Sequence, residues 1–149
     1  MNMNYYPKKL LVIYLAMVGI GLTLACGGDD SPTPEELRQQ ELTATWALGT
    51  VVNDGQDVTS QFNGFTLTIT SEQTYSTNNG GNAWPAAGSF QLVSSNLEEF
   101  TRDDGVRVTI TTISETNLSL TFQITEVGGS AFGSNGITGT FIFNLNKTS

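Results

Sequence analysis

In the stretch Leu118-Ser119-Leu120-Thr121-Phe122-Gln123-Ile124-Thr125, apolar and polar side chains alternate without a break. Successive side chains of a β-strand point to opposite faces of the sheet, so this alternation predicts a strand with one buried face. The same pattern recurs at 65–70, 106–111 and 137–145. Four weaker strands are predicted around aromatic side chains, namely Trp46, Tyr75, Phe90 and Phe100. The sequence therefore predicts eight strands.

Turn-forming pairs separate these strands. Asparagine followed by glycine tolerates a positive φ in tight turns, as at Asn63-Gly64, Asn79-Gly80 and Asn135-Gly136. Short strands joined by tight turns favour an all-β fold, an antiparallel meander whose eight strands close into a barrel without exposed edges. A β-sandwich is the alternative, although it usually needs longer crossover connections. The many large apolar side chains on the inward faces favour a filled or nearly filled interior.

A short helix is predicted ahead of the strands. Thr33 can cap it, Pro34 suits its first turn, and Glu36 completes a capping box. We expect the helix to end near Glu41 and to lie against one end of the domain, with Leu37 as its main apolar residue.

The N-terminal segment has the order of a bacterial export signal. Lys8 and Lys9 precede an apolar run of fifteen residues, Leu10–Leu24, which Ala25 and Cys26 follow. A membrane-spanning helix needs about 20 residues, whereas the core of a signal peptide has about 7–15. The end of this segment resembles the lipobox of bacterial lipoproteins. That resemblance implies cleavage before Cys26 and acylation of its sulfur. An ordinary secretory signal followed by a free thiol is the alternative.

The expected domain organisation follows from this signal. Residues 1–25 form a signal peptide, residues 26–34 a flexible acidic linker, and residues 35–149 the barrel domain. Asp29-Asp30 resembles the short acidic stretch that directs lipoproteins of the Bacteroidota to the outer face of the outer membrane. The alternative is a solvated linker without a targeting role.

Composition excludes several classes of function. After cleavage before Cys26, four basic and fourteen acidic residues would remain, which gives a formal side-chain charge of −10. Such a surface repels nucleic-acid phosphates, so we expect no nucleic-acid partner. The chain has no histidine and one cysteine, which excludes histidine-based triads and histidine zinc sites. We therefore expect no enzymatic activity, no cofactor and no metal site.

Five motifs follow one another along the chain: Leu42-Thr43-Ala44-Thr45-Trp46, Phe65-Thr66-Leu67-Thr68-Ile69, Trp84-Pro85 with Gly88-Ser89-Phe90, Arg102-Asp103-Asp104-Gly105, and Leu118-Ser119-Leu120-Thr121-Phe122. In this order and spacing they resemble the lipocalin-like lipoproteins of the Bacteroidota. The resemblance implies a small calycin-type barrel on a lipid anchor, without catalysis. It also implies that an arginine, here Arg102, stacks on Trp46 to close one end of the barrel.

The expected function is non-enzymatic binding at the barrel mouth or on its rim loops. The ligand would be a small apolar molecule, a peptide or a glycan, and the candidate ligand-binding residues are Tyr75, Trp84, Phe90, Arg102 and Phe122. Trp84 lies in a polar loop, where an aromatic side chain is either a recognition residue or a lid over the core. The alternative function is a structural module that docks onto another cell-envelope protein. A cavity lined by Tyr75, Phe90 and Phe122 would favour the first function, and an exposed apolar patch around Trp84 the second.

Overall fold

Consecutive strands of the domain are hydrogen-bonded neighbours, so the chain builds its sheet as an antiparallel meander. The computed structural model describes residues 31–125 and 138–148. The described elements are the helix α2 (Pro34–Leu42), the 3₁₀ helix η1 (Thr59–Phe62), and the strands β1 (Ala44–Asn53), β2 (Gln56–Asp57), β3 (Thr66–Ile69), β4 (Thr74–Asn78), β5 (Ala87–Val93), β6 (Asn96–Arg102), β7 (Arg107–Ile113), β8 (Asn117–Ile124) and β9 (Gly139–Lys147).

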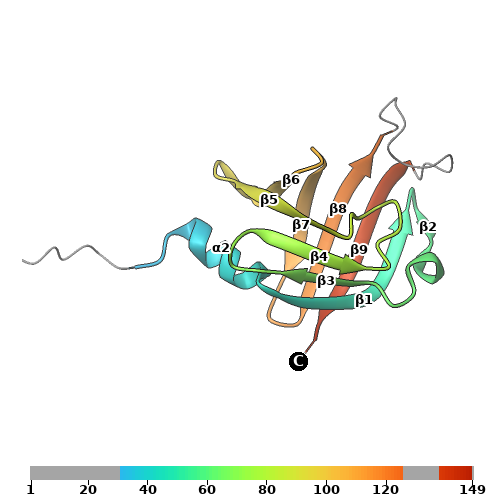
Figure 1. Cartoon of the computed structure of the whole chain (residues 1–149), viewed down its shortest axis with the longest axis horizontal. Coiled ribbons are helices and arrows are strands. Elements are labelled where there is room, and N and C mark those ends of the chain that lie inside the picture. Colours follow the sequence, from blue (N-terminus) through green and yellow to red (C-terminus); the bar gives the residue numbers. More distant parts are fainter. Residues whose placement is uncertain (1–30, 126–137, 149) are drawn as a thin grey trace, which may run out of the picture. The chain divides into compact units, whose positions relative to one another are not determined.

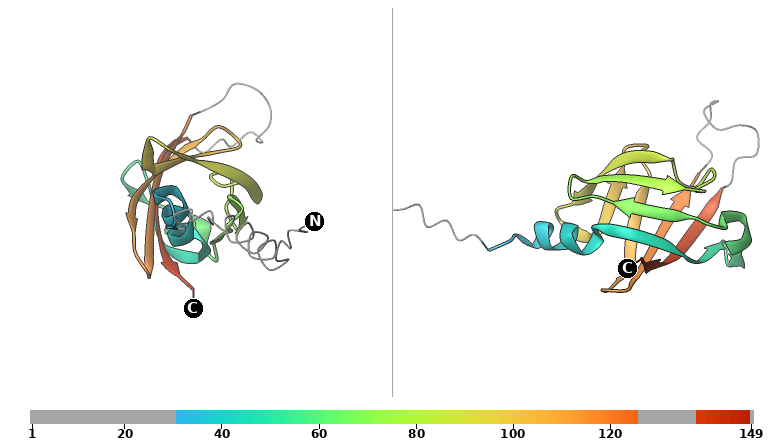
Figure 2. Two further views of the ribbon diagram at one scale, coloured as in Figure 1. Left: turned by 90° about the vertical axis from the view of Figure 1, so that its left-hand side faces the viewer. Right: turned by 60° about the horizontal axis from the view of Figure 1, so that its bottom comes forward.

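The sheet closes on itself through the pairing of its first and last long strands. β1 pairs with β9 from Trp46↔Lys147 to Asn53↔Phe141, while β2 only extends the far end of β1. The eight strands β1 and β3–β9 therefore form a closed antiparallel barrel, which Figures 1 and 2 show from three sides. The predicted eight-stranded meander barrel is confirmed, and the alternative β-sandwich is not the fold.

Alternate connections of the meander lie at the same end of the barrel. The turns 70–73, 94–95 and 114–116 lie at the end where α2 packs, which we call the helix end. The connections 54–65, 79–86 and 103–106 lie at the opposite end, which we call the loop end.

The connection 54–65 contains the two elements that were not predicted, β2 and η1. Asp54 and Gly55 both have positive φ, at 46° and 82°, and form the two-residue turn between β1 and β2. η1 then carries Phe62 into the core, where its ring packs edge-on against Phe143 with the centroids 5.1 Å apart. Because Phe62 comes from a connection, strand alternation does not reveal it.

The helix α2 begins as predicted but buries different residues. The Glu36 amide donates to Thr33 Oγ1, and the Thr33 amide donates to Glu36 Oε2, which completes the capping box. Leu37, the expected apolar contact, is 46% exposed. The buried residues are instead Leu42 and Gln39, whose amide Nε2 donates to the Thr70 carbonyl oxygen at 2.6 Å. The helix therefore lies over the helix end of the barrel through its C-terminal turn.

The inward-facing side chains form one hydrophobic core. Its largest members are the buried aromatic and leucine side chains Trp46, Trp84, Phe62, Phe65, Phe100, Phe141, Phe143, Leu42, Leu67, Leu118, Leu120 and Leu145. Residues Pro32–Ser149 form one compact unit. A unit with its own core of this size is expected to fold without the residues that precede it.

Candidate functional site

The connection 79–86 between β4 and β5 turns inward and places Trp84 in the core. Asn79 and Gly81 adopt positive φ, and the amide of Trp84 donates to the Gly80 carbonyl oxygen at 3.1 Å. A Cβ atom on Gly80 would lie only 2.5 Å from the Trp84 carbonyl oxygen, so this tight turn requires glycine. The Trp84 side chain is 2% exposed. Of the two predicted roles for this tryptophan, the structure places it over the core and not on the surface.

Three aromatic rings surround the Trp84 indole. Its ring centroid lies 5.3 Å from Phe122, 5.6 Å from Tyr75 and 6.3 Å from Phe143, all in edge-to-face arrangements. Edge-to-face pairs are the favoured geometry because the positive ring edge meets the negative ring face. Three strands, β4, β8 and β9, therefore hold the indole in one orientation.

Arg102, the last residue of β6, lies on these rings and is itself buried. Its guanidinium carbon lies 4.6 Å from the Trp84 ring centroid and 5.5 Å from that of Phe122. Its Nη1 donates to the Ala83 carbonyl oxygen at 2.9 Å, its Nε donates to Asp104 Oδ1 at 3.1 Å, and its Nη2 donates to Asp104 Oδ2. We call Tyr75, Trp84, Arg102 and Phe122 the Trp84 cluster.

The expected stacking of Arg102 on Trp46 is wrong. Trp46 lies near the start of β1, at the helix end, whereas Arg102 lies at the loop end of the barrel. The cation over Trp46 is instead Lys147, whose Nζ lies 5.7 Å from the ring centroid. Lys147 is the β9 neighbour of Trp46. This pairing was missed because it depends on the register with which the first and last strands close the barrel.

The connection 103–106 is fastened to β5 beside the cluster. Asp103 Oδ2 accepts a hydrogen bond from the Ser89 amide at 3.0 Å, and Asp103 Oδ1 accepts one from the Tyr75 hydroxyl at 3.4 Å. Gly88 leaves room for the hydrogen bond between Tyr75 and Asp103. A Cβ atom on this residue would lie 2.6 Å from Asp103 Oδ1 and 2.6 Å from the Tyr75 hydroxyl oxygen.

Tyr75 should therefore ionise at unusually high pH. Burial of the side chain raises the pKa of Tyr75 to about 12, because removal from water disfavours the phenolate. It is the only tyrosine after residue 26, so the change in ultraviolet absorbance that accompanies phenol ionisation in the chain from Gly27 onward would report this group alone. Stability from the neutral phenol is complete below the ordinary pKa near 10 and is lost as the pH rises through about 12. A transition of the folded protein at pH 10 would contradict this prediction.

Asp104 is held in its charged form by its neighbours. Burial alone would raise the pKa of its carboxyl group, but the hydrogen bonds and charge of Arg102, together with the Val106 amide, outweigh burial and lower it. The buried Arg102 cation is thus paired with a charged carboxylate.

All five candidate ligand-binding residues are buried. Four of them form the Trp84 cluster, and Phe90 packs against Phe100 with ring centroids 4.9 Å apart. Phe90 is also the β5 neighbour of Arg102 on β6. The large apolar side chain that is exposed within 31–125 and 138–148 is Leu37, far from Trp84. The exposed apolar patch around Trp84 that would favour a docking module is therefore not seen among the described residues.

One polar atom of the cluster is left without a partner. Within the described part of the chain, the buried indole N–H of Trp84 makes no hydrogen bond. The other tryptophan differs, since Trp46 Nε1 donates to the Leu42 carbonyl oxygen at 3.0 Å. A buried donor without an acceptor costs about 1–3 kcal/mol. The Trp84 cluster thus combines a free hydrogen-bond donor, a cation and aromatic rings, and groups of these kinds can contact a ligand.

Cys26, the predicted lipidation site, lies outside the described residues, as do residues 1–25 and most of the predicted linker. Among the described residues, no helix has the length and apolar character needed to cross a membrane. A scan against protein-family models and searches of curated proteins and of solved structures find no significant match to this chain.

Proposed function

We propose that this chain is a lipid-anchored lipoprotein of the outer membrane, similar to those of the Bacteroidota, whose lipocalin-like barrel faces the cell surface. In this proposal the barrel has no enzymatic activity and binds a small apolar ligand at its loop end. An eight-stranded antiparallel barrel is compatible with such a binding domain, because a barrel of this size can hold one small ligand.

The anchor is supported by the order of residues around Cys26. A basic start, an apolar core of fifteen residues and a small residue before the cysteine match a cleaved lipoprotein signal better than a permanent span. Acyl chains on one cysteine would hold the protein at the membrane, since each buried methylene contributes about 0.8 kcal/mol. Expression of Cys26→Ser should move the protein from the membrane fraction to the soluble fraction. Retention of the variant in the outer membrane would refute the anchor.

The unpartnered indole N–H of Trp84 carries the proposal for binding. A ligand with an oxygen acceptor next to an apolar body would satisfy this donor and contact the surrounding rings. Arg102 has five N–H groups, of which three donate to Asp104 and Ala83. The cation would therefore favour a ligand that carries a carboxylate or carbonyl group.

The binding proposal is tested with a fluorescent fatty acid, 11-(dansylamino)undecanoic acid, and the chain from Gly27 onward. We expect saturable binding that weakens about fivefold in Trp84→Phe, which keeps a ring but loses the donor. Trp46→Phe is the matched control, because its N–H already donates to Leu42 within the protein, and it should bind like the wild type. Equal loss in both variants, or no saturable binding of the wild type, would refute ligand binding at the Trp84 cluster.

The second candidate function is a docking module for another cell-envelope protein. The observation that favours it is the dense filling of the barrel, where the Phe122 ring stacks against Phe141 and Phe143 with centroids 5.6 Å and 5.5 Å apart. A ligand would have to displace side chains from such a core. Absence of fatty-acid binding together with a stable cross-link to one outer-membrane protein in cells would favour this function.

A further inference from the structure

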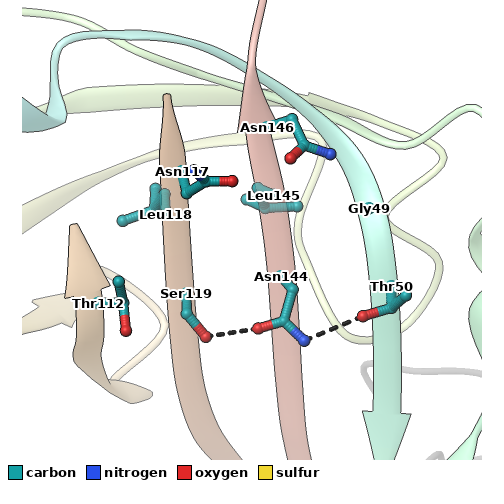
Figure 3. A pocket seen from close by; sticks show the side chains of 9 residues that line it. All are labelled: Gly49, Thr50, Thr112, Asn117, Leu118, Ser119, Asn144, Leu145 and Asn146. Carbon is teal, nitrogen blue, oxygen red and sulfur yellow. Dashed lines mark hydrogen bonds between the residues drawn. The ribbon is translucent and has the colours of Figure 1, made fainter. Parts of the chain in front are cut away.

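We propose that the outer wall of the barrel carries a separate binding site for a neutral glycan. A groove of about 370 Å³ runs across β1, β9 and β8 to the edge of β7. Gly49, Thr50, Asn117, Ser119, Asn144 and Asn146 are among the residues that line it (Figure 3). This groove lies on the opposite side of the barrel wall from the Trp84 cluster, so the inference does not depend on the proposed function.

A bulge in β1 shapes the floor of the groove. The register between β1 and β9 shifts between Leu48 and Thr50, which leaves Gly49 as the extra residue. A Cβ atom on Gly49 would lie 2.7 Å from the Asn144 carbonyl oxygen and 3.1 Å from Asn146 Nδ2. Only glycine therefore allows the two backbones to come this close, a feature found where a strand leaves room for a ligand or another backbone.

A chain of hydrogen bonds orients the central amide. Ser119 Oγ donates to Asn144 Oδ1 at 2.7 Å, and Asn144 Nδ2 donates to Thr50 Oγ1 at 2.9 Å (Figure 3). In this arrangement the Asn144 amide oxygen faces β8 and its nitrogen faces β1. Since the Thr50 hydroxyl accepts from Asn144, its own proton remains for a ligand, as does the second N–H of Asn144.

Two further amides lie next to this chain. Asn117 and Asn146 are direct neighbours across β8 and β9. Asn117 Nδ2 donates to Thr116 Oγ1 at 2.7 Å, which leaves the side-chain oxygen of Asn117 as an acceptor. The Asn146 amide lies over Gly49 and can both donate and accept. The groove thus presents oriented donors and acceptors within one short stretch of sheet.

These groups select the class of ligand. The residues that line the groove are amides, hydroxyl-bearing side chains, leucines and a glycine, so neither an anion nor a cation meets an opposite charge there. Sugar hydroxyls both donate and accept, which matches a mixed neutral lining. The side-chain charge of −10 beyond residue 26 would repel an acidic polysaccharide, so the ligand is a neutral one. The volume lies at the lower end of the range of about 300–1,000 Å³ for ligand pockets.

Nuclear magnetic resonance tests this site with the isotope-labelled chain from Gly27 onward. The probes are five neutral hexasaccharides, built from glucose, mannose, galactose, xylose or N-acetylglucosamine, each at millimolar concentration. We expect at least one to shift amide signals at 49–50, 117–119 and 144–146 in a saturable way. No shift with any of the five, or shifts confined to the loop end, would overturn the proposal.

The chain offers a matched pair of variants for this test. Asn78 on β4 makes a similar hydrogen bond, because its Nδ2 donates to Oγ1 of Thr66 on the adjacent strand β3 at 2.9 Å. Asn78 does not line the groove. Asn144→Ala should weaken sugar binding at least tenfold, whereas Asn78→Ala should leave it unchanged. Asn146→Ala, at an exposed position, should also weaken binding without unfolding the domain. Equal affinity of the Asn144 and Asn78 variants, or the same shifts with tetra-alanine peptide, would overturn the glycan assignment.

Discussion

Replacing Phe143 with alanine is expected to lower the free energy of unfolding by about 3–5 kcal/mol. The Phe143 side chain is fully buried, and its ring centroid lies 5.1 Å from those of Phe62 and Phe65 and 5.5 Å from that of Phe122. Alanine would leave a cavity among rings from the connection 54–65 and from β8, which cannot all move inward. The free energy of unfolding of a small domain is only about 5–15 kcal/mol, so this loss would remove a large part of its stability.

Urea unfolding of the chain from Gly27 onward measures this effect. The control is Asn144→Ala, the next residue of β9, whose side chain points outward and is exposed. It should cost no more than about 1 kcal/mol through its lost hydrogen bonds. Similar urea midpoints for Phe143→Ala and Asn144→Ala would mean that the Phe143 ring does not stabilise the core as described.

Replacing Asp104 with alanine is expected to cost about 3 kcal/mol of stability. The change would leave Arg102 buried at the loop end without its carboxylate, and an unpaired buried charge is strongly destabilising. Asp104→Asn keeps an oxygen acceptor for Arg102 and for the Val106 amide, so it should cost about half as much. Thermal unfolding monitored by circular dichroism compares the two variants. A wild-type melting temperature in Asp104→Ala would contradict the role assigned to this pair.

The stabilisation by Asp104 should also depend on pH in a defined direction. The pKa of this carboxyl group lies below its ordinary value because of Arg102, so the folded state binds the proton less well than the unfolded chain. Stability from the pair is therefore complete above the ordinary pKa near 4 and is lost as the pH falls through the lowered one. The difference between wild type and Asp104→Asn should shrink over that acidic range.

The strands could be predicted because their signal is local. Alternation over 118–125 corresponds to β8, Asn117–Ile124, and even the five-residue strand β4 was predicted from the surroundings of Tyr75. Closure into a barrel also followed, since eight short strands joined in a meander can remove their edges in this way. Each of these inferences needed only neighbouring residues or the number of strands.

The candidate site was harder to predict because its contacts join distant segments. Arg102 was assigned to Trp46 from a resemblance, yet the two residues lie at opposite ends of the barrel. The composition of the loop around Trp84 left open whether the indole is a recognition residue or a lid over the core, and the turn at Gly80 directs it into the core. Which cation meets which ring depends on strand register and loop direction, and neither is encoded by alternation.

The pairing of β1 with β9 has a consequence for the order of folding. Ala47 and Asn146 are neighbours in the barrel although they lie about 100 residues apart in the chain. Bringing such distant segments together costs loop-closure entropy before any contact compensates for it, and a fold with this contact order forms slowly. The barrel cannot close until β9 is available. A nascent or partly translocated chain that still lacks β9 would therefore remain an open sheet, and the native barrel would form only once β9 can pair with β1.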